Sequence, residues 1–314
     1  MNKDTFIAIG AGLASALLSV AVAYGSGIGL VLAYFALLPM LLIGLSGGPK
    51  SAGIAATAGV FGAIFLTNIF QGALFGITVA LPAWLIVRYT LMTRTARDGT
   101  THRFPMGEVL SRLAALGAIV LVISSVTYFD APGGFPKTIE NFLDNILSAR
   151  VQFNVPAERH LLVQRLIPFF PAIIVSSWIV MTLINSMIAQ TILLKAGRNL
   201  RPAIQYSQIR APEWLYWGIV AGGGIALLGS GAFEYVGRNL VMILAIPFFF
   251  IGLAIAHTLV RFLRSPGVAL GAFYFLMIIS SWAIVAVATI GYFEEWVGLR
   301  QKFGSSPQKA DEDE

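Results

Sequence analysis

The chain has 314 residues, of which 57% are hydrophobic and only 11% charged, with a formal net charge of +6 and no cysteine. An ordinary soluble domain carries roughly 25% charged residues and about 45–50% apolar ones. The composition therefore excludes the ordinary soluble class and indicates an integral membrane protein. The missing cysteines exclude disulfides, thiol catalysis and iron–sulfur clusters. With only three histidines as well, we expect no metal and no cofactor.

Apolar runs bounded by glycine, proline or charge predict nine membrane-spanning helices, because a hydrocarbon core about 30 Å thick needs about 20 helical residues. Their expected ranges are 5–23, 28–45, 52–68, 72–91, 108–129, 166–194, 214–232, 239–262 and 268–291. The runs lack the period-two alternation of barrel strands. The predicted fold class is an all-α polytopic transmembrane helical bundle. Residues 1–291 are expected to form a single membrane domain, followed by an interfacial segment and a disordered acidic tail over 292–314.

Two short segments rich in glycine or polar residues predict tight turns between antiparallel helices. Gly47-Gly48-Pro49-Lys50 separates the second run from the third. Thr67-Asn68, followed by Gln71-Gly72, separates the third from the fourth.

The distribution of Lys and Arg predicts the orientation, because cationic loops remain on the cytoplasmic side. Most of these residues fall in loops on the same side as Met1, above all in 92–106 and 195–213. We therefore expect a multi-pass protein of the bacterial inner membrane with a cytoplasmic N-terminus. Nine crossings would then place the acidic tail Asp311–Glu314 outside.

The basic loops also bear on partners. Juxtamembrane cationic clusters attract anionic lipids at roughly 1 kcal/mol per charge, so membrane lipids are the expected partners. Nucleic-acid binding requires a basic domain with groove-reading or aromatic elements, and no stretch here is long enough to form one. We therefore expect no nucleic acid.

The longest connection, 130–164, contains an amphipathic pattern. Its apolar residues recur at helical spacing with acidic and amide residues on the other face: Ile139, Phe142, Leu143, Ile146 and Leu147 against Glu140, Asp144 and Asn145. This pattern predicts a helix on the outer membrane surface between spans five and six. It could cap the bundle or act as a lid over a substrate site.

Polar residues inside spans are candidates for function because they cost free energy unless they are paired. We expect Asn68, Gln71, Asn185 and Trp282 to line an outward-opening cavity for a small-molecule ligand of unknown identity. For Asn68 and Gln71 the alternative is a helix cap or turn. For Asn185 it is a seam between helices.

His257 lies near the end of the eighth run. Of the three histidines, this one lies within an apolar run, which makes it a candidate proton relay. The alternative is an interfacial histidine that forms a hydrogen bond with a backbone carbonyl.

Small residues recur every fourth position in three runs. The rows are Ala8, Gly12 and Ala16; Ala55, Gly59 and Ala63; and Gly72, Gly76 and Ala80. Such rows let helices approach closely, so we expect these faces to be interhelical. The pattern leaves open whether the partner is internal or another protein.

Two catalytic signatures are missing from the sequence. It contains no H-E-x-x-H and no G-x-x-x-x-G-K-[ST], which removes the zinc protease and Walker ATPase readings. We therefore expect no enzymatic activity and no catalytic residues. An energised transporter would need another subunit or an ion gradient.

Three passages resemble the YybS-like family of uncharacterised bacterial membrane proteins, in its alphaproteobacterial form. They are the Leu81-Pro82-Ala83-Trp84-Leu85 to Arg88 helix exit; Asn185 to Arg198, leading into Arg201-Pro202 and Ala211-Pro212-Glu213-Trp214; and Gly291 to Trp296 with Leu299-Arg300. That family is distantly similar to the substrate-binding subunits of energy-coupling-factor transporters. In those subunits a small-residue row on the first helix docks a coupling subunit, and Ala8, Gly12 and Ala16 match that type of row.

The resemblance implies a small-molecule binding or transport bundle, with a coupling or ATPase subunit as a partner. Those transporter subunits have about six spans, fewer than the nine predicted here. The alternative is a non-enzymatic membrane scaffold or assembly factor that acts through helix–helix contacts, which accounts for the same small-residue faces and basic loops without a ligand.

Overall fold

The computed structural model describes residues 2–24, 27–95, 101–103, 105–150, 156–200 and 209–304. The described chain is helical, as predicted, apart from two paired three-residue strands, β1 (Thr93–Thr95) and β2 (Thr101–Arg103). It divides into two compact units: Met1–Val109 with Ser177–Ile204, and Leu110–Ser176 with Gln205–Glu314. Two of the three boundaries fall within helices, α6 (Met106–Thr127) and α9 (Phe170–Lys195).

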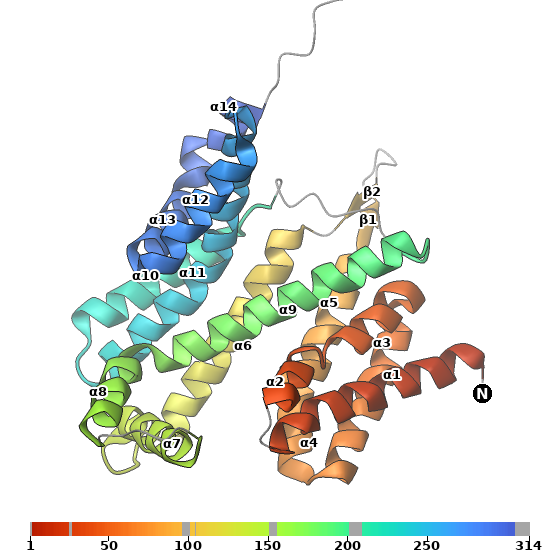
Figure 1. Cartoon of the computed structure of the whole chain (residues 1–314), viewed down its shortest axis with the longest axis horizontal. Helices are drawn as coiled ribbons and strands as arrows, with labels where there is room; N and C mark the ends of the chain where they lie inside the picture. Colours follow the sequence, from red (N-terminus) through yellow and green to blue (C-terminus); the bar gives the residue numbers. More distant parts are fainter. Residues whose placement is uncertain are drawn as a thin grey trace, which may run out of the picture. The chain divides into compact units, whose positions relative to one another are not determined.

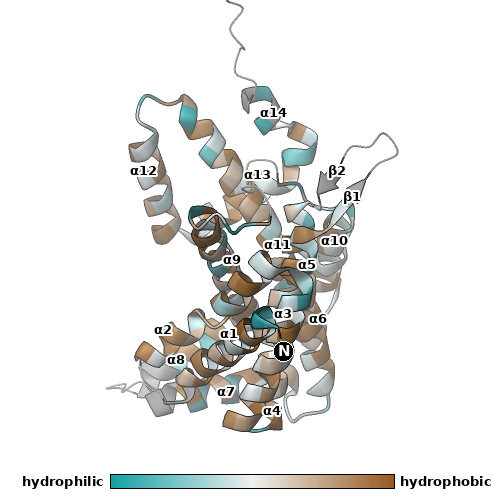
Figure 2. Cartoon of the chain, turned by 90° about the vertical axis from the view of Figure 1, so that its right-hand side faces the viewer, coloured by the Kyte–Doolittle hydropathy of each residue, from teal (hydrophilic) through white to brown (hydrophobic). Residues whose placement is uncertain are grey.

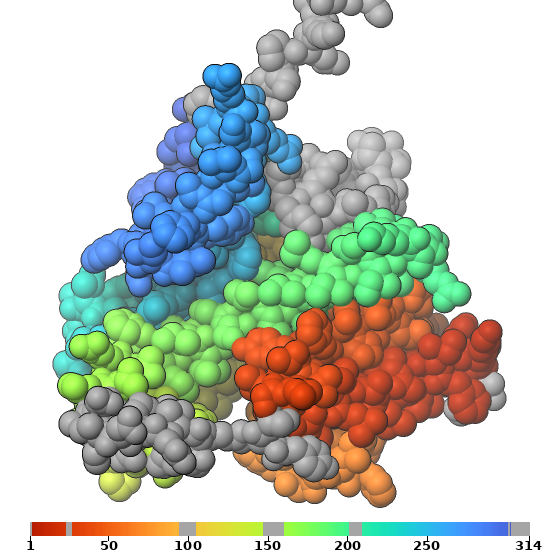
Figure 3. Space-filling view, viewed as in Figure 1, coloured from red at the N-terminus to blue at the C-terminus, as the bar shows by residue number. Residues whose placement is uncertain are grey.

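The first unit is built mainly from the N-terminal helices, red to orange in Figure 1. Its elements are α1 (Lys3–Val20), the 3-10 turn η1 (Ala21–Tyr24), α2 (Gly27–Tyr34), α3 (Leu38–Leu66), α4 (Ile69–Phe75), the π-helix η2 (Gly76–Ala80) and α5 (Leu81–Leu91), with β1, β2, the start of α6 and the later part of α9. In the space-filling view the red and orange side chains form a closely packed surface (Figure 3).

The predicted turn at Gly47-Gly48-Pro49-Lys50 is present inside α3. Gly48 has φ 87° and ψ 178°, a conformation that favours glycine, and Pro49 has no N–H to continue the helix. A Cβ placed on Gly44 would lie 3.0 Å from Cβ of Ala52. Residues eight apart are about 12 Å apart along a straight helix, so the two halves of α3 fold back on each other.

A π-helix interrupts the fourth predicted run. Over Gly76–Ala80 the helix widens, which changes the backbone hydrogen-bond pattern. Nε1 of Trp178 in α9 donates to the carbonyl of Thr78 at 2.8 Å. This bond ties α9 to the wide turn within the first unit.

The second unit contains the C-terminal helices, cyan to blue in Figure 1. Its elements are the rest of α6, α7 (Gly134–Arg150), α8 (Pro156–Leu166), the 3-10 turn η3 (Ile167–Phe169), the start of α9, α10 (Glu213–Leu228), α11 (Ala232–Leu259), the 3-10 turn η5 (Val260–Phe262), α12 (Pro266–Ile279), α13 (Ser281–Val297) and α14 (Leu299–Gly304). Glycines bring α11 and α13 together: a Cβ on Gly291 would lie 2.8 Å from the backbone nitrogen of Gly252.

The amphipathic segment forms a helix over Gly134–Arg150. Leu143 is buried while Phe142 is half exposed, so its apolar residues are not all on the packed face. Residues 151–155 of the predicted segment lie outside the described residues. A place for α7 on the outer membrane surface stays a prediction.

Within the described residues, six helical segments are long and apolar enough to cross a membrane, or up to seven if the bent pair α12–α13 counts as one span. The prediction of nine spans is not confirmed. It would also require the two halves of Gly27–Leu66 to cross separately, and the 16-residue α10 to cross despite its shortness. Large apolar side chains nevertheless face outward throughout, for example Phe65 at 91% and Leu228 at 91% exposure. The hydrophobic colouring along the helices in Figure 2 is consistent with lipid contact.

The end of α13 differs from the expected boundary at residue 291. The helix continues to Val297, Gly298 adopts a left-handed conformation with φ 62°, and α14 follows. The described part of the predicted interfacial segment after residue 291 is therefore divided between α13 and α14. Nη1 of Arg300 donates to the carbonyl of Ile209 at 2.8 Å. Nine alternating crossings would put the end of α13 and the start of α10 on opposite membrane surfaces, whereas this bond brings these regions together. The tail Asp311–Glu314 lies outside the described residues.

Candidate binding site

Asn68 and Gln71 form a helix cap. Asn68 precedes α4, and its Oδ1 accepts a hydrogen bond from the backbone N–H of Gln71 at 3.0 Å. Both residues are exposed. The geometry matches the capping alternative, because an N-cap side chain satisfies a free N–H of the first turn.

Asn185 is a buried seam residue of the first unit, with 1% of its surface exposed. Its Nδ2 donates to the carbonyl of Tyr34 at 2.7 Å and to that of Met181 at 2.9 Å. Tyr34 ends α2, where the turn before α3 frees backbone carbonyls. Asn185 thus stabilises a break in the bundle. Oδ1 of Asn185 has no hydrogen-bond partner among the described residues.

The small-residue row of the first helix is covered by α3. Ala8 and Ala16 are 0% exposed, and a Cβ on Gly12 would overlap the carbonyl oxygen of Ala55 and lie 2.9 Å from the nitrogen of Gly59. The row is interhelical, as predicted, and its partner is internal. Docking of a coupling subunit on Ala8, Gly12 and Ala16, which the resemblance implies, does not fit this packing.

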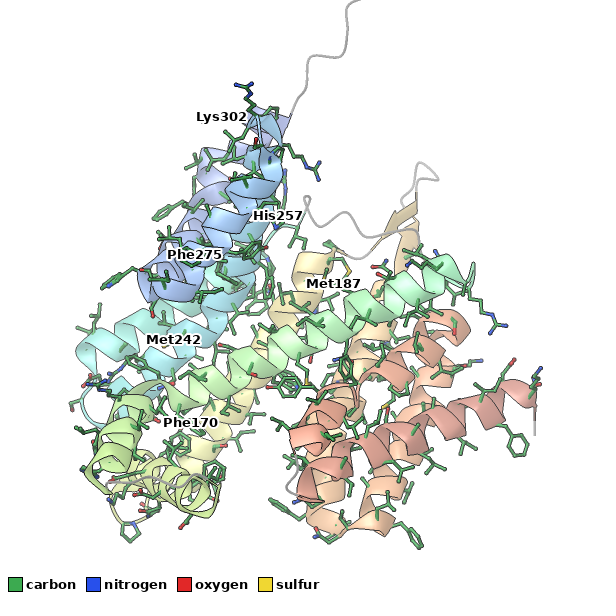
Figure 4. All side chains as sticks on the ribbon, viewed as in Figure 1. Phe170, Met187, Met242, His257, Phe275 and Lys302 are labelled. Carbon is green, nitrogen blue, oxygen red and sulfur yellow. The ribbon has the colours of Figure 1, made fainter. Side chains whose placement is uncertain are left out.

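The two remaining predicted residues lie in the second unit. Trp282 follows the bend between α12 and α13 and is 81% exposed. Nε2 of His257 lies 2.8 Å from the hydroxyl of Tyr274 in α12, so its partner is a hydroxyl and not the carbonyl of the alternative reading. His257 is labelled on α11 in Figure 4. Neither residue belongs to the same unit as Asn68, Gln71 and Asn185, and the shared cavity stays a prediction.

A cavity in the first unit is too small for an organic ligand. Its volume is about 30 Å³, and its polar lining residues are Thr90, Ser186, Gln190 and Asn199. A cavity needs roughly 10–15 Å³ on this measure to hold one water. This cavity therefore has room for a few waters only.

A larger cavity lies between α10 and α13 in the second unit, with a volume of about 460 Å³. We call it the acidic aromatic pocket, and it is lined by Ala211, Glu213, Tyr216, Trp217, Val220, Tyr292, Glu295 and Trp296. Small-molecule sites typically measure about 300–1,000 Å³. Its size and mixed lining therefore suit an organic ligand.

The rings of the pocket pack against one another. The ring centroid of Tyr216 is 5.1 Å from that of Tyr292 and 5.1 Å from that of Trp296. Phe248 of α11 supports them from behind, 4.8 Å from Tyr216. Inclined rings at these separations are favourable. This packing holds the aromatic wall in a fixed arrangement.

The two carboxylates of the pocket are exposed, and neither Glu213 nor Glu295 makes an ion pair within the described ranges. The adjacent Glu294 is different. It is 6% exposed and accepts hydrogen bonds of 3.0 Å from the backbone N–H of Leu299 and from Nε of Arg300. Glu294 therefore fixes the corner between α13 and α14, while Glu295 remains available at the pocket.

Neither the pocket nor two sets of buried hydrogen bonds, which we call polar clamps, were predicted from the sequence. Asn239 is fully buried; its Oδ1 accepts from the N–H of Ala172 at 3.0 Å, and its Nδ2 donates to the carbonyl of Pro168 at 3.0 Å. Tyr235 donates to the carbonyl of Ile167 at 2.8 Å. The second clamp is Glu294 with Arg300. Pro168 and Pro171 next to an apolar run were a usable signal, because prolines leave backbone carbonyls without intrahelical donors.

The comparisons with known proteins give a family and nothing finer. A family described as "Predicted membrane protein (DUF2232)" matches residues 13–294, which fits the YybS-like resemblance over most of the chain. No curated protein matches the chain, and no solved structure matches it. Similarity to energy-coupling-factor subunits is therefore not shown by these comparisons.

Proposed function

Since the chain belongs to the DUF2232 family of membrane proteins, we propose that it is a multi-pass protein that binds a small molecule in the acidic aromatic pocket. One observation carries the proposal: a cavity of about 460 Å³ combines aromatic rings with two carboxylates that make no ion pair in the described chain. Packing alone does not require unpaired acids at such a position. The proposal includes no chemical reaction.

Transport of the ligand is part of the proposal. Broken helices often accompany substrate sites in transporters, and here α12 and α13 are bent by 116° at their junction. Because α3 covers the small-residue row of α1, a coupling subunit would have to bind elsewhere. A carrier that acts without an ATPase subunit is the simpler form of the proposal.

The pocket opens, in this proposal, on the cytoplasmic side of the inner membrane. Glu213 starts α10 directly after the basic 195–213 loop, which the positive-inside rule assigns to the cytoplasm. This side differs from the outward-opening cavity that we expected from Asn68, Gln71, Asn185 and Trp282.

A thermal-shift screen tests the proposal. The purified protein is heated in detergent with a panel of cationic, neutral and anionic metabolites, because a ligand at 100 times its Kd stabilises the folded state by about 2.7 kcal/mol. Val220→Trp fills the pocket from an exposed position, and Val268→Trp on α12 is the matched control; these valines are 54% and 74% exposed. We expect a stabilising compound that loses its effect in Val220→Trp alone. If no compound stabilises the wild type, or if the effect persists in Val220→Trp, the protein is better explained as a scaffold.

A further inference from the structure

We propose that the ligand of the acidic aromatic pocket is an organic ammonium compound, in which a positively charged amine carries small alkyl groups. This inference rests on the proposed function and specifies the ligand class. Its basis is the juxtaposition of Glu213 and Glu295 with the rings of Tyr216, Tyr292 and Trp296 around one cavity. The ammonium group can belong to a soluble amine or to a lipid headgroup.

The position of Glu295 is the first argument for a cationic ligand. A carboxylate in the last turn of a helix faces the negative end of the helix dipole, which is unfavourable by some tenths of a kcal/mol up to about 1. Glu295 lies in that turn of α13 beside a second acid, Glu294. Glu294 is compensated by Arg300, but Glu295 makes no ion pair in the described ranges. A bound cation supplies the missing compensation.

Glu213 adds a second negative charge from the other wall. It is the first residue of α10, where the dipole favours an acid, so helix stability alone accounts for its presence. Its place in the lining of the same cavity nevertheless doubles the negative charge there. Two acids at one cavity repel anions and attract cations.

The aromatic wall favours alkylammonium over an inorganic cation. A ring face is negative, and ammonium groups bind within about 6 Å of a ring centroid. The rings of Tyr216, Tyr292 and Trp296 have centroids 5.1 to 5.6 Å apart, so one small ammonium group can approach more than one ring. Val220 and Ala211 complete the wall with apolar groups that cannot replace the hydration shell of Na⁺ or K⁺.

Nearby cations leave the pocket acidic. Arg300 is 13% exposed on its side chain and is held by Glu294 and by the carbonyl of Ile209. Arg210, adjacent to the lining residue Ala211, is exposed and makes no ion pair in the described ranges. Within the described ranges, neither arginine forms an ion pair with Glu213 or Glu295.

Interfacial aromatic residues have a second common role. Trp and Tyr gather at the membrane–water boundary, and Trp217 and Trp296 are 67% and 64% exposed. A belt residue does not discriminate a cation from a neutral molecule of the same shape. Comparing a cationic probe with a neutral probe of the same shape therefore distinguishes a cation site from a belt of interfacial aromatic residues.

Isothermal titration of the full-length protein in a neutral detergent tests the ligand class. The probes are choline and 3,3-dimethylbutan-1-ol, its neutral isostere with carbon in place of nitrogen. We expect choline to bind at least tenfold more tightly than the alcohol. Glu295→Gln should raise the Kd for choline about tenfold, Trp296→Leu should do the same, and Glu234→Gln, which removes an exposed acid paired with Arg238 at 2.9 Å, should leave it unchanged.

A parallel measurement separates the two sources of the ammonium group. Mixed micelles containing phosphatidylcholine or phosphatidylglycerol are analysed by native mass spectrometry, and retention of the former that is lost in Glu295→Gln assigns the site to a lipid headgroup. Choline binding without lipid retention assigns it to a soluble amine.

The outcomes distinguish the two proposals. If the alcohol binds as tightly as choline, or if Glu295→Gln has no effect on either probe, the ammonium inference is wrong while a binding pocket remains. If neither ammonium source binds but another compound from the thermal-shift panel does, the ligand class is also wrong. If nothing binds at the pocket in any of these measurements, the proposed function fails as well.

Discussion

A paired substitution in α1 tests the packing of the first unit. Gly10→Ala and Gly12→Ala add the same methyl group to the same helix, two positions apart. A Cβ on Gly10 meets no atom within 4 Å. A Cβ on Gly12 overlaps the carbonyl oxygen of Ala55 and lies 2.9 Å from the nitrogen of Gly59.

The expected magnitudes follow from these surroundings. Replacing glycine by alanine inside a helix stabilises it by about 1 kcal/mol. Gly10→Ala should show this gain in full. At Gly12 the neighbouring atoms are backbone, which cannot rotate away, so overpacking costs about 1–3 kcal/mol. Gly12→Ala should therefore be less stable than Gly10→Ala by about 1–3 kcal/mol.

Both free energies of unfolding can be measured in mixed micelles by titration with sodium dodecyl sulfate, followed by tryptophan fluorescence. Equal stability of the two variants would refute the reasoning. It would mean that α1 does not pack on α3 through the row of Ala8, Gly12 and Ala16, and the row would again be available to another protein.

The remaining predictions concern buried polar groups and topology. Asn239→Leu removes the partners of the Pro168 carbonyl and the Ala172 N–H, and should lower the free energy of unfolding by about 1–3 kcal/mol in the same titration; a neutral effect would show that the clamp on α9 is dispensable. Glu294→Gln should cost about 3 kcal/mol, because it removes the carboxylate partner of the largely buried Arg300, whereas Glu295→Gln should raise stability by some tenths of a kcal/mol up to about 1, because it removes a negative charge from the last turn of α13; similar losses in both would contradict the distinction between these acids. The native chain has no cysteine, so single cysteines at the exposed positions Arg210 and Lys302 can be labelled from one side with an impermeant maleimide. We expect both cysteines to react from the cytoplasmic side, and a cysteine at Ser230, at the far end of α10, to react from the outside. If the cysteine at Lys302 reacts from the same side as the one at Ser230, the tail lies outside, as the nine-span prediction requires (Lys302 is labelled in Figure 4).

Local sequence patterns were enough to predict where most of the helices lie. Hydrophobic runs of sufficient length have to be helical in lipid, because only a helix or a closed barrel satisfies every backbone hydrogen bond there. The breaks at Gly48 and Asn68 also follow locally, since glycine permits φ of 87° and the asparagine side chain caps the next helix. The amphipathic pattern likewise predicted the helix α7, and the spacing of Ala8, Gly12 and Ala16 predicted an interhelical face.

The role of polar residues depended on tertiary neighbours. Asn185 and Asn239 are the same residue type in similar apolar surroundings, yet the first holds the break after Tyr34 and the second holds the broken start of α9. Nothing in the linear spacing assigns either partner, because they are more than 60 residues away.

The candidate pocket was decided by the tertiary structure alone. Glu213 and Glu295 are far apart in sequence, and only the packing of α10 and α13 on α11 brings them to one cavity. The bend of 116° between α12 and α13 is equally invisible in the sequence, because Ser280-Ser281 within a continuous apolar stretch is compatible with an uninterrupted helix. Sequence by itself determined which segments are apolar helices. Tertiary packing decided the bend between α12 and α13, which faces the helices cover and which charges they leave unpaired, because these properties arise from contacts between residues distant along the chain.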